Sequence, residues 1–221
     1  MCSGEKVGKS SYKGVAALKK PKQDGKRKVI IITDGDEVAR MAVEAAARQV
    51  GGRVISRSAG NPTPLNGQQL VKLIQEAKHD PVLVMFDDNG DGEESYGERA
   101  LREIATHPLI EVLGAVAVAS KTPYVEGTPV DFSIDNQGHI LYDEVDKDGR
   151  PSHTGQLLIH GDTVDVLKEL DIPIIIGMGD PGKMEGHDHV ENRAPVTTAA
   201  VQEILKRSGF VSEMESQEKS Y

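Results

Sequence analysis

Short apolar runs alternate with longer helical patterns along most of this 221-residue chain. The apolar runs are rich in Val, Ile and Leu and are flanked by glycine, proline or acidic residues, which is typical of buried strands. Strands are predicted at residues 29–33, 53–58, 82–86, 111–119 and 172–176. Helices are predicted at residues 37–50, 67–78, 98–106, 163–170 and 195–208. Repeated strand–helix–strand units of this length indicate a parallel sheet with crossover connections.

One segment in the second half of the chain departs from this alternation. Residues 130–134 and 139–142 predict a β-hairpin, because a polar turn that ends in Gly138 separates them. We therefore predict an α/β fold with a mostly parallel open sheet and helices on both faces, in a Rossmann-like or flavodoxin-like three-layer arrangement. The hairpin is expected as an insertion at the sheet edge, at about residues 124–150.

The formal charge of −9 is unevenly distributed along the chain. Residues 1–28 carry nine basic side chains against two acidic ones, a net charge of +7, so the remainder carries −16. We expect residues 1–27 to form a disordered basic arm, residues 28–210 to form a single domain, and residues 211–221 to form a frayed tail.

The basic arm has two interpretations that the sequence leaves open. It is either a solvated tail or an electrostatic tether to an anionic membrane surface, where each Lys or Arg contributes about 1 kcal/mol. Nucleic acid is disfavoured as a partner, because the body is acidic and has no basic stripe with interleaved aromatic residues. The residues of the predicted tether are Lys19, Lys20, Lys22, Lys26, Arg27 and Lys28.

Cysteine content and apolar stretches also limit where in the cell we expect the protein. The single cysteine, Cys2, excludes an intrachain disulfide and leaves nucleophilic thiol catalysis without a candidate in the body. No apolar stretch reaches the roughly 18 to 20 residues that span a bilayer, and a signal-peptide core is absent. We therefore expect a chain that is made in the cytoplasm and is soluble, or at most peripheral to a membrane.

Acidic side chains follow two of the predicted strands. Asp34 and Asp36 come after the strand at 29–33, and Asp87 and Asp88 come after the strand at 82–86. The carboxyl ends of parallel strands line the crevice where open α/β sheets bind ligands, and carboxylate oxygens suit Mg²⁺ or Ca²⁺. These four residues therefore form a hypothetical cation site. The alternative is that they are ordinary helix caps.

Other residues are expected to line the same crevice. Ser120 follows the fourth strand and Lys183 follows the last one, a pattern that faintly resembles receiver domains and topoisomerase-primase domains. Mg²⁺-dependent phosphotransfer is therefore kept as an alternative function. Further lining residues are Asn61 in a proline-rich loop, and Gly177, Gly179 and Asp180.

Two motifs are given less weight. Residues 177–182 match a dinucleotide-binding glycine pattern, but no helix follows directly, so we favour a loop that approaches neighbouring backbone closely. His187, Asp188, His189 and Glu191, joined by His153 or His160, have the residue types of zinc ligands. A single His-x-His in a polar loop is more often solvated.

Several longer stretches carry distinctive residue combinations. They are TDGDE (33–37), SAGNPTPLNG (58–67), PVLVMFDDNG (81–90), ATHPLIEVLGAVAVAS (105–120), GDTVDVLKELDIPIIIGMGDPGKM (161–184) and APVTTAAVQEILKRSG (194–209). In this order they resemble the stage V sporulation protein AE family, the soluble member of the stage V sporulation A operon. The resemblance does not extend to the arm at residues 1–27. Within the resemblance, Glu-Gly-His-Asp-His at 185–189 stands where a Gly- and Asp-rich turn is expected.

The resemblance implies a soluble accessory protein of sporulation and germination, peripheral to the spore inner membrane. Its implied partners are integral membrane proteins of the same operon, which move calcium dipicolinate into the developing spore and release it at germination. The family has no established catalytic residues, so the resemblance assigns none. The sequence leaves open whether the chain forms a homo-oligomer.

Overall fold

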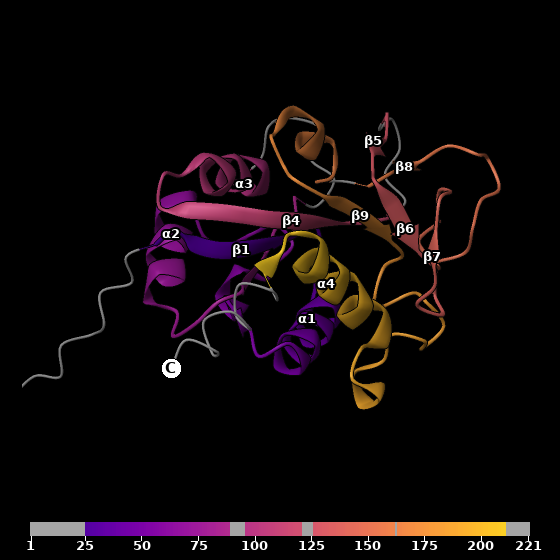
Figure 1. Ribbon diagram of the computed structural model, residues 1–221, viewed down its shortest axis with the longest axis horizontal. Helices are drawn as coiled ribbons and strands as arrows, with labels where there is room; N and C mark the ends of the chain where they lie inside the picture. Colours follow the sequence, from indigo (N-terminus) through magenta and orange to yellow (C-terminus); the bar gives the residue numbers. More distant parts are fainter. Residues whose placement is uncertain (1–24, 89–95, 121–125, 162, 211–221) are drawn as a thin grey trace, which may run out of the picture.

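The computed structural model describes residues 25–88, 96–120, 126–161 and 163–210, and within them a seven-stranded sheet forms the centre of the molecule (Figure 1). The strand order is β2-β3-β1-β4-β9-β6-β7. The strands of this sheet are β1 (Arg27–Ile32), β2 (Arg53–Val54), β3 (Val82–Met85), β4 (Ile110–Val118), β6 (Phe132–Ile134), β7 (Ile140–Leu141) and β9 (Ile175–Met178). The helices are α1 (Glu37–Gln49), α2 (Gly67–Glu76), α3 (Tyr96–Thr106) and α4 (Pro195–Arg207).

All neighbouring strands of the sheet are parallel except β7, which is antiparallel to β6. Helices α1 and α4 pack together on one face, and α2 and α3 pack together on the other (Figure 1). These observations confirm the predicted three-layer α/β class. In detail the first strand, β1, lies between β3 and β4, so the strand order differs from both the Rossmann and the flavodoxin orders.

Strand β1 shows why both faces are covered. Val29 and Ile31 belong to the core under α2 and α3, whereas Ile30 and Ile32 belong to the core under α1 and α4. All four side chains are at most 1% exposed. Successive side chains of a strand point to opposite faces, so a continuous apolar run has to be buried on both sides. Each such burial contributes roughly 1.5–3 kcal/mol.

The predicted hairpin forms at the sheet edge. Strand β6 pairs with β9 on one side and with β7 on the other, and β7 ends the sheet. The turn is closed by Asp135, whose Oδ1 accepts the backbone N–H groups of Gln137 and His139 at 2.9 and 2.8 Å. Gly138 has a φ of 84°, which favours glycine there. A separate two-stranded sheet of β5 (Thr128–Pro129) and β8 (Leu158–Ile159) was not predicted.

Two predicted elements differ from the structure. The strand predicted at 53–58 ends at Val54 and continues as a 3-10 helix, η1 (Ser56–Ser58), because the Ser58 hydroxyl accepts the Met85 N–H at 2.9 Å in place of a backbone carbonyl. The helix predicted at 163–170 is only a 3-10 helix, η2 (Asp165–Glu169). There the Val164 carbonyl accepts the Leu167 N–H at 3.0 Å, a 3-10 bond, and also the Thr128 hydroxyl at 2.7 Å, a tertiary contact.

The first strand begins two residues earlier than predicted, at Arg27. The Arg27 side chain is buried, its Nη2 lies 2.8 Å from Asp80 Oδ1, and its Nη1 donates to the Ala77 carbonyl at 2.9 Å. A side chain held in this way cannot face a membrane surface. Arg27 is therefore removed from the predicted tether, whereas Lys26 is exposed. Residues 1–24 and 211–221 lie outside the described residues, so their disorder stays a prediction.

Candidate functional site

The carboxyl ends of β1 and β3 lie side by side at a point where the chain turns to opposite faces of the sheet. After β1 the chain enters α1 on one face, and after β3 it leads to α3 on the other face (Figure 1). Such a switch point is where open α/β sheets bind ligands. Asp34 follows β1 and Asp87 follows β3, so the structure brings together two of the predicted carboxylates.

Three loops are joined by backbone contacts at this point. The Gly35 N–H donates to Asp87 Oδ2 at 3.2 Å, and the Gly60 N–H donates to the Gly35 carbonyl at 2.7 Å. Thr63 exchanges hydrogen bonds with the backbone of Asp87, at 2.8 Å in each direction. A Cβ added at Gly35 would lie 2.6 Å from the Gly60 carbonyl oxygen, so only glycine allows this approach. The sequence prediction missed Gly35, Gly60 and Thr63.

Asp34 is the most perturbed group of this cluster. Its side chain is buried, and its Oδ1 accepts the Asp36 N–H at 3.2 Å. Burial and, to a smaller extent, the negative charges of Asp36, Asp180 and Asp87 together raise the pKa of Asp34 to about 8. The Asp34 carboxyl is therefore mostly protonated at neutral pH and can exchange a proton close to that pH.

Asp180 and Lys183 complete the cluster from the end of β9. Asp180 is buried, its Oδ1 accepts the Gly182 N–H at 2.8 Å, and its Oδ2 accepts a hydrogen bond from the Lys183 ammonium. This hydrogen bond raises the pKa of Lys183, and the charges of Asp34 and Asp36 add to the effect. The predicted grouping of Asp180 and Lys183 with the first acidic strand end is therefore present in the structure.

The other two predicted carboxylates act as helix caps. Asp36 Oδ1 accepts the Ala39 N–H at 2.8 Å at the start of α1, and Asp88 Oδ1 accepts the Gly97 N–H at 2.7 Å at the start of α3. In the described part of the chain, no group of three or more His, Cys, Asp or Glu side chains is placed to hold a metal ion. The predicted Mg²⁺ or Ca²⁺ site at these carboxylates therefore stays a prediction.

The remaining predicted lining residues have structural roles around the cluster. Asn61 is exposed and precedes a cis proline in the loop that covers the end of β3. The Ser120 N–H donates to the His160 carbonyl at 2.9 Å. Added Cβ atoms at Gly177 and Gly179 would each lie 2.5 Å from a neighbour, Ile159 and Gly149 respectively. Both glycines therefore allow close packing, as expected for this segment.

The histidine-rich segment caps the last helix. Asp188 Oδ1 accepts the N–H groups of Val196 and Thr197 at 2.7 and 3.0 Å, and burial raises its pKa. This cap is supplied from a distance because the residue that precedes α4, Ala194, has no side-chain acceptor. His187 and His189 are exposed, and no zinc cluster forms among the described residues.

Fold and site together define an open α/β protein with a cluster of acidic residues at a topological switch point. The chain matches the family model described as stage V sporulation protein AE1 over residues 28–208, and it belongs to that family. Neither the curated proteins nor the solved structures contain a match. Within the described ranges, every helix is too short or too polar to cross a membrane.

Proposed function

We propose that this sporulation protein is an accessory factor at the spore inner membrane, where it acts with integral membrane proteins of its operon in the uptake or release of calcium dipicolinate. The observation that carries the proposal is the family match over residues 28–208. Contact with the membrane is peripheral and is made through the basic arm. The acidic cluster faces away from it.

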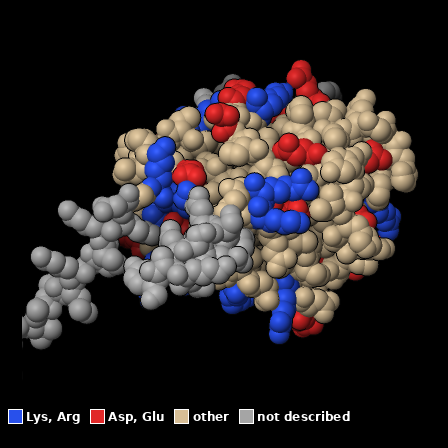
Figure 2. Space-filling view, in the orientation of Figure 1, with Lys and Arg blue, Asp and Glu red and all other residues tan. Residues whose placement is uncertain are grey.

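The geometry of the chain supports this orientation. The arm enters the domain at the amino end of β1, whereas Asp34 lies at the carboxyl end of the same strand. On the face that Figure 2 shows, Lys and Arg side chains are interspersed with Asp and Glu, so the domain offers no large basic patch there. The concentrated positive charge of residues 1–26 is therefore the part of the chain best suited to anionic lipid.

Vesicle sedimentation tests the tether. Changing four arm lysines to glutamine should weaken binding to phosphatidylglycerol-containing vesicles by roughly a thousandfold, since each contributes about 1 kcal/mol. Neutral phosphatidylcholine vesicles should bind neither protein. The four changes are Lys19→Gln, Lys20→Gln, Lys22→Gln and Lys26→Gln.

A control with the same net charge separates the arm from bulk charge. It carries Arg48→Gln, Lys72→Gln, Arg193→Gln and Lys206→Gln, all at exposed positions of the domain. This control should bind vesicles almost as well as the unchanged protein. Equal loss in both variants would contradict the tether. Spores that carry the arm variant should also contain less dipicolinate, and normal content would contradict the proposed role.

A second candidate function is Mg²⁺-dependent phosphotransfer of the receiver type. The observation in its favour is the grouping of Asp34, Asp87 and Lys183, which follow the carboxyl ends of β1, β3 and β9. Incubation with acetyl phosphate and Mg²⁺ should then add one phosphoryl group, detected by mass, that Asp87→Asn abolishes and Asp171→Asn does not. A protein that stays unmodified would exclude this candidate.

A further inference from the structure

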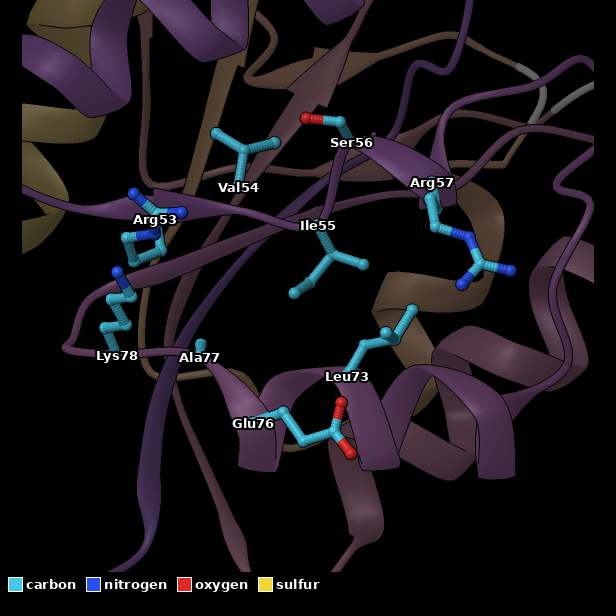
Figure 3. Close-up of a pocket in the computed structure, with 9 residues that line it drawn as sticks. All are labelled: Arg53, Val54, Ile55, Ser56, Arg57, Leu73, Glu76, Ala77 and Lys78. Atoms are coloured by element: carbon cyan, nitrogen blue, oxygen red, sulfur yellow. The ribbon is translucent and has the colours of Figure 1, made fainter. Parts of the chain in front are cut away.

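A hollow of about 350 Å³ lies at the β2 edge of the sheet, the edge opposite the hairpin. It is formed between β2 with η1 and the C-terminal half of α2 (Figure 3). Its middle is apolar. Ile55, between β2 and η1, points into the hollow, and Leu73 and Ala77 point toward it from the helix side. Among the strands that the structure describes, β2 pairs with β3 alone and ends the sheet on this side.

Basic side chains stand at both ends of the hollow. Arg53 and Lys78 lie at one end and Arg57 lies at the other, with the apolar residues between them (Figure 3). All three are exposed, and in the described part of the chain none of them makes an ion pair or a side-chain hydrogen bond. Of the described residues that line the wall, Glu76 is the one that carries a carboxylate. The hollow is thus positively charged on a protein whose net charge is −9.

We propose that this hollow binds a small organic dianion with an acidic group at each end and an apolar middle. Arg57 pairs with one acidic group, and Arg53 and Lys78 pair with the other. The guanidinium groups suit carboxylates in particular, because their planar donor fork matches two carboxylate oxygens. The apolar part of the ligand lies on Ile55, Leu73 and Ala77 and is removed from water.

The size of the hollow agrees with this class of ligand. About 350 Å³ is at the lower end of the range of small-molecule sites, which suits one ring or a short chain. The site goes beyond the proposed function and does not rest on it, because it uses neither the arm nor the acidic cluster. Loss of vesicle binding and loss of dianion binding can therefore be observed independently.

Calorimetry with the full chain tests the proposal, with benzene-1,4-dicarboxylate as the probe. Benzoate, which keeps the ring and one carboxylate, should bind about fivefold more weakly, as expected for the loss of one exposed ion pair. Inorganic phosphate, which has the charge without the apolar body, should also bind more weakly. Equal binding of phosphate, or no heat with the dicarboxylate at millimolar concentration, would overturn the proposal.

Single substitutions locate the site. Arg57→Gln and Lys78→Gln act at opposite ends of the hollow, and each should raise the Kd for the dicarboxylate about fivefold. Arg48→Gln removes an exposed arginine from α1, outside the hollow, and should leave the Kd unchanged. Circular dichroism checks that the variants are folded. A Kd that responds equally to all three changes would show bulk electrostatics and contradict a defined site.

Discussion

The two ends of the sheet differ in how their charged side chains are arranged. At the amino end, opposite charges are paired: Arg27 with Asp80 at 2.8 Å, and Lys28 with Glu111 at 2.7 Å. At the carboxyl end, the carboxylates of Asp34, Asp36, Asp87 and Asp180 crowd together although Lys183 pairs with Asp180, and the pKa of Asp34 rises to about 8. Pairing serves stability, whereas crowded like charges oppose it and are typical of functional sites. The ion pairs at the amino end therefore stabilise the fold, whereas the crowded carboxylates at the carboxyl end are typical of a functional site.

The largest effect is expected at the amino end. Arg27→Ala leaves Asp80 without its buried partner and should lower the free energy of unfolding by about 3–5 kcal/mol, measured by urea denaturation. Lys28→Ala breaks the half-exposed pair with Glu111 and should lower it by about 1 kcal/mol or less. Similar losses in the two variants would show that burial does not distinguish these pairs.

At the carboxyl end, Asp34→Asn should change the pH dependence of stability. The pKa of about 8 lies above the ordinary value of 3.8, so the folded protein binds more protons than the unfolded one between these values. The free energy of unfolding therefore falls as pH rises through this window, by up to about 1.4 kcal/mol per pH unit. Asparagine keeps the acceptor for the Asp36 N–H and does not titrate.

The variant should accordingly gain stability relative to the unchanged protein by up to about 3 kcal/mol between about pH 5 and about pH 7. Urea denaturation of both proteins at each pH measures the difference. Asp171→Asn, at an exposed loop position, is the control and should run parallel to the unchanged protein. A constant difference between Asp34→Asn and the unchanged protein would refute the raised pKa.

A smaller effect is expected where the loops meet. Gly35→Ala places a Cβ 2.6 Å from the Gly60 carbonyl oxygen and 2.9 Å from Asp87 Cβ, and should destabilise the protein by about 1–3 kcal/mol. Gly25→Ala is the matched control, because a Cβ there meets nothing within 4 Å. Thermal unfolding compares the two. A neutral Gly35→Ala would show that the loops separate easily.

Much of the fold could be predicted from local patterns. Val29 to Ile32 are apolar at every position, and this requires burial on both faces whatever the neighbours are. The predicted secondary structure was wrong where contacts with residues far away in the chain determine it. Ser58 ends β2 by accepting the Met85 N–H, and Thr128 bonds the Val164 carbonyl just before η2. Neither contact leaves a pattern within the segment itself.

The candidate site was predictable in part for the same reason. Acidic residues after two strands indicated that Asp34 and Asp87 would meet, because parallel strands end at one edge. Their division of roles was not predictable. Asp36 and Asp88 cap helices, which the capping alternative covers, while Asp34 is buried among three other carboxylates. The hollow beside β2 was missed because its two walls come from separate segments of the chain, residues 53–57 and 73–78.

The sequence by itself determined the α/β class, the basic arm on an acidic body and the family, since all three follow from residue order and composition. Only the tertiary structure decided that β1 lies between β3 and β4, that Arg27 is a buried partner of Asp80, and that Asp34 holds its proton near neutral pH. Local patterns report which surfaces must be buried. Burial depth and the distances between charges depend on segments far apart in the chain, and these set both pairing and pKa.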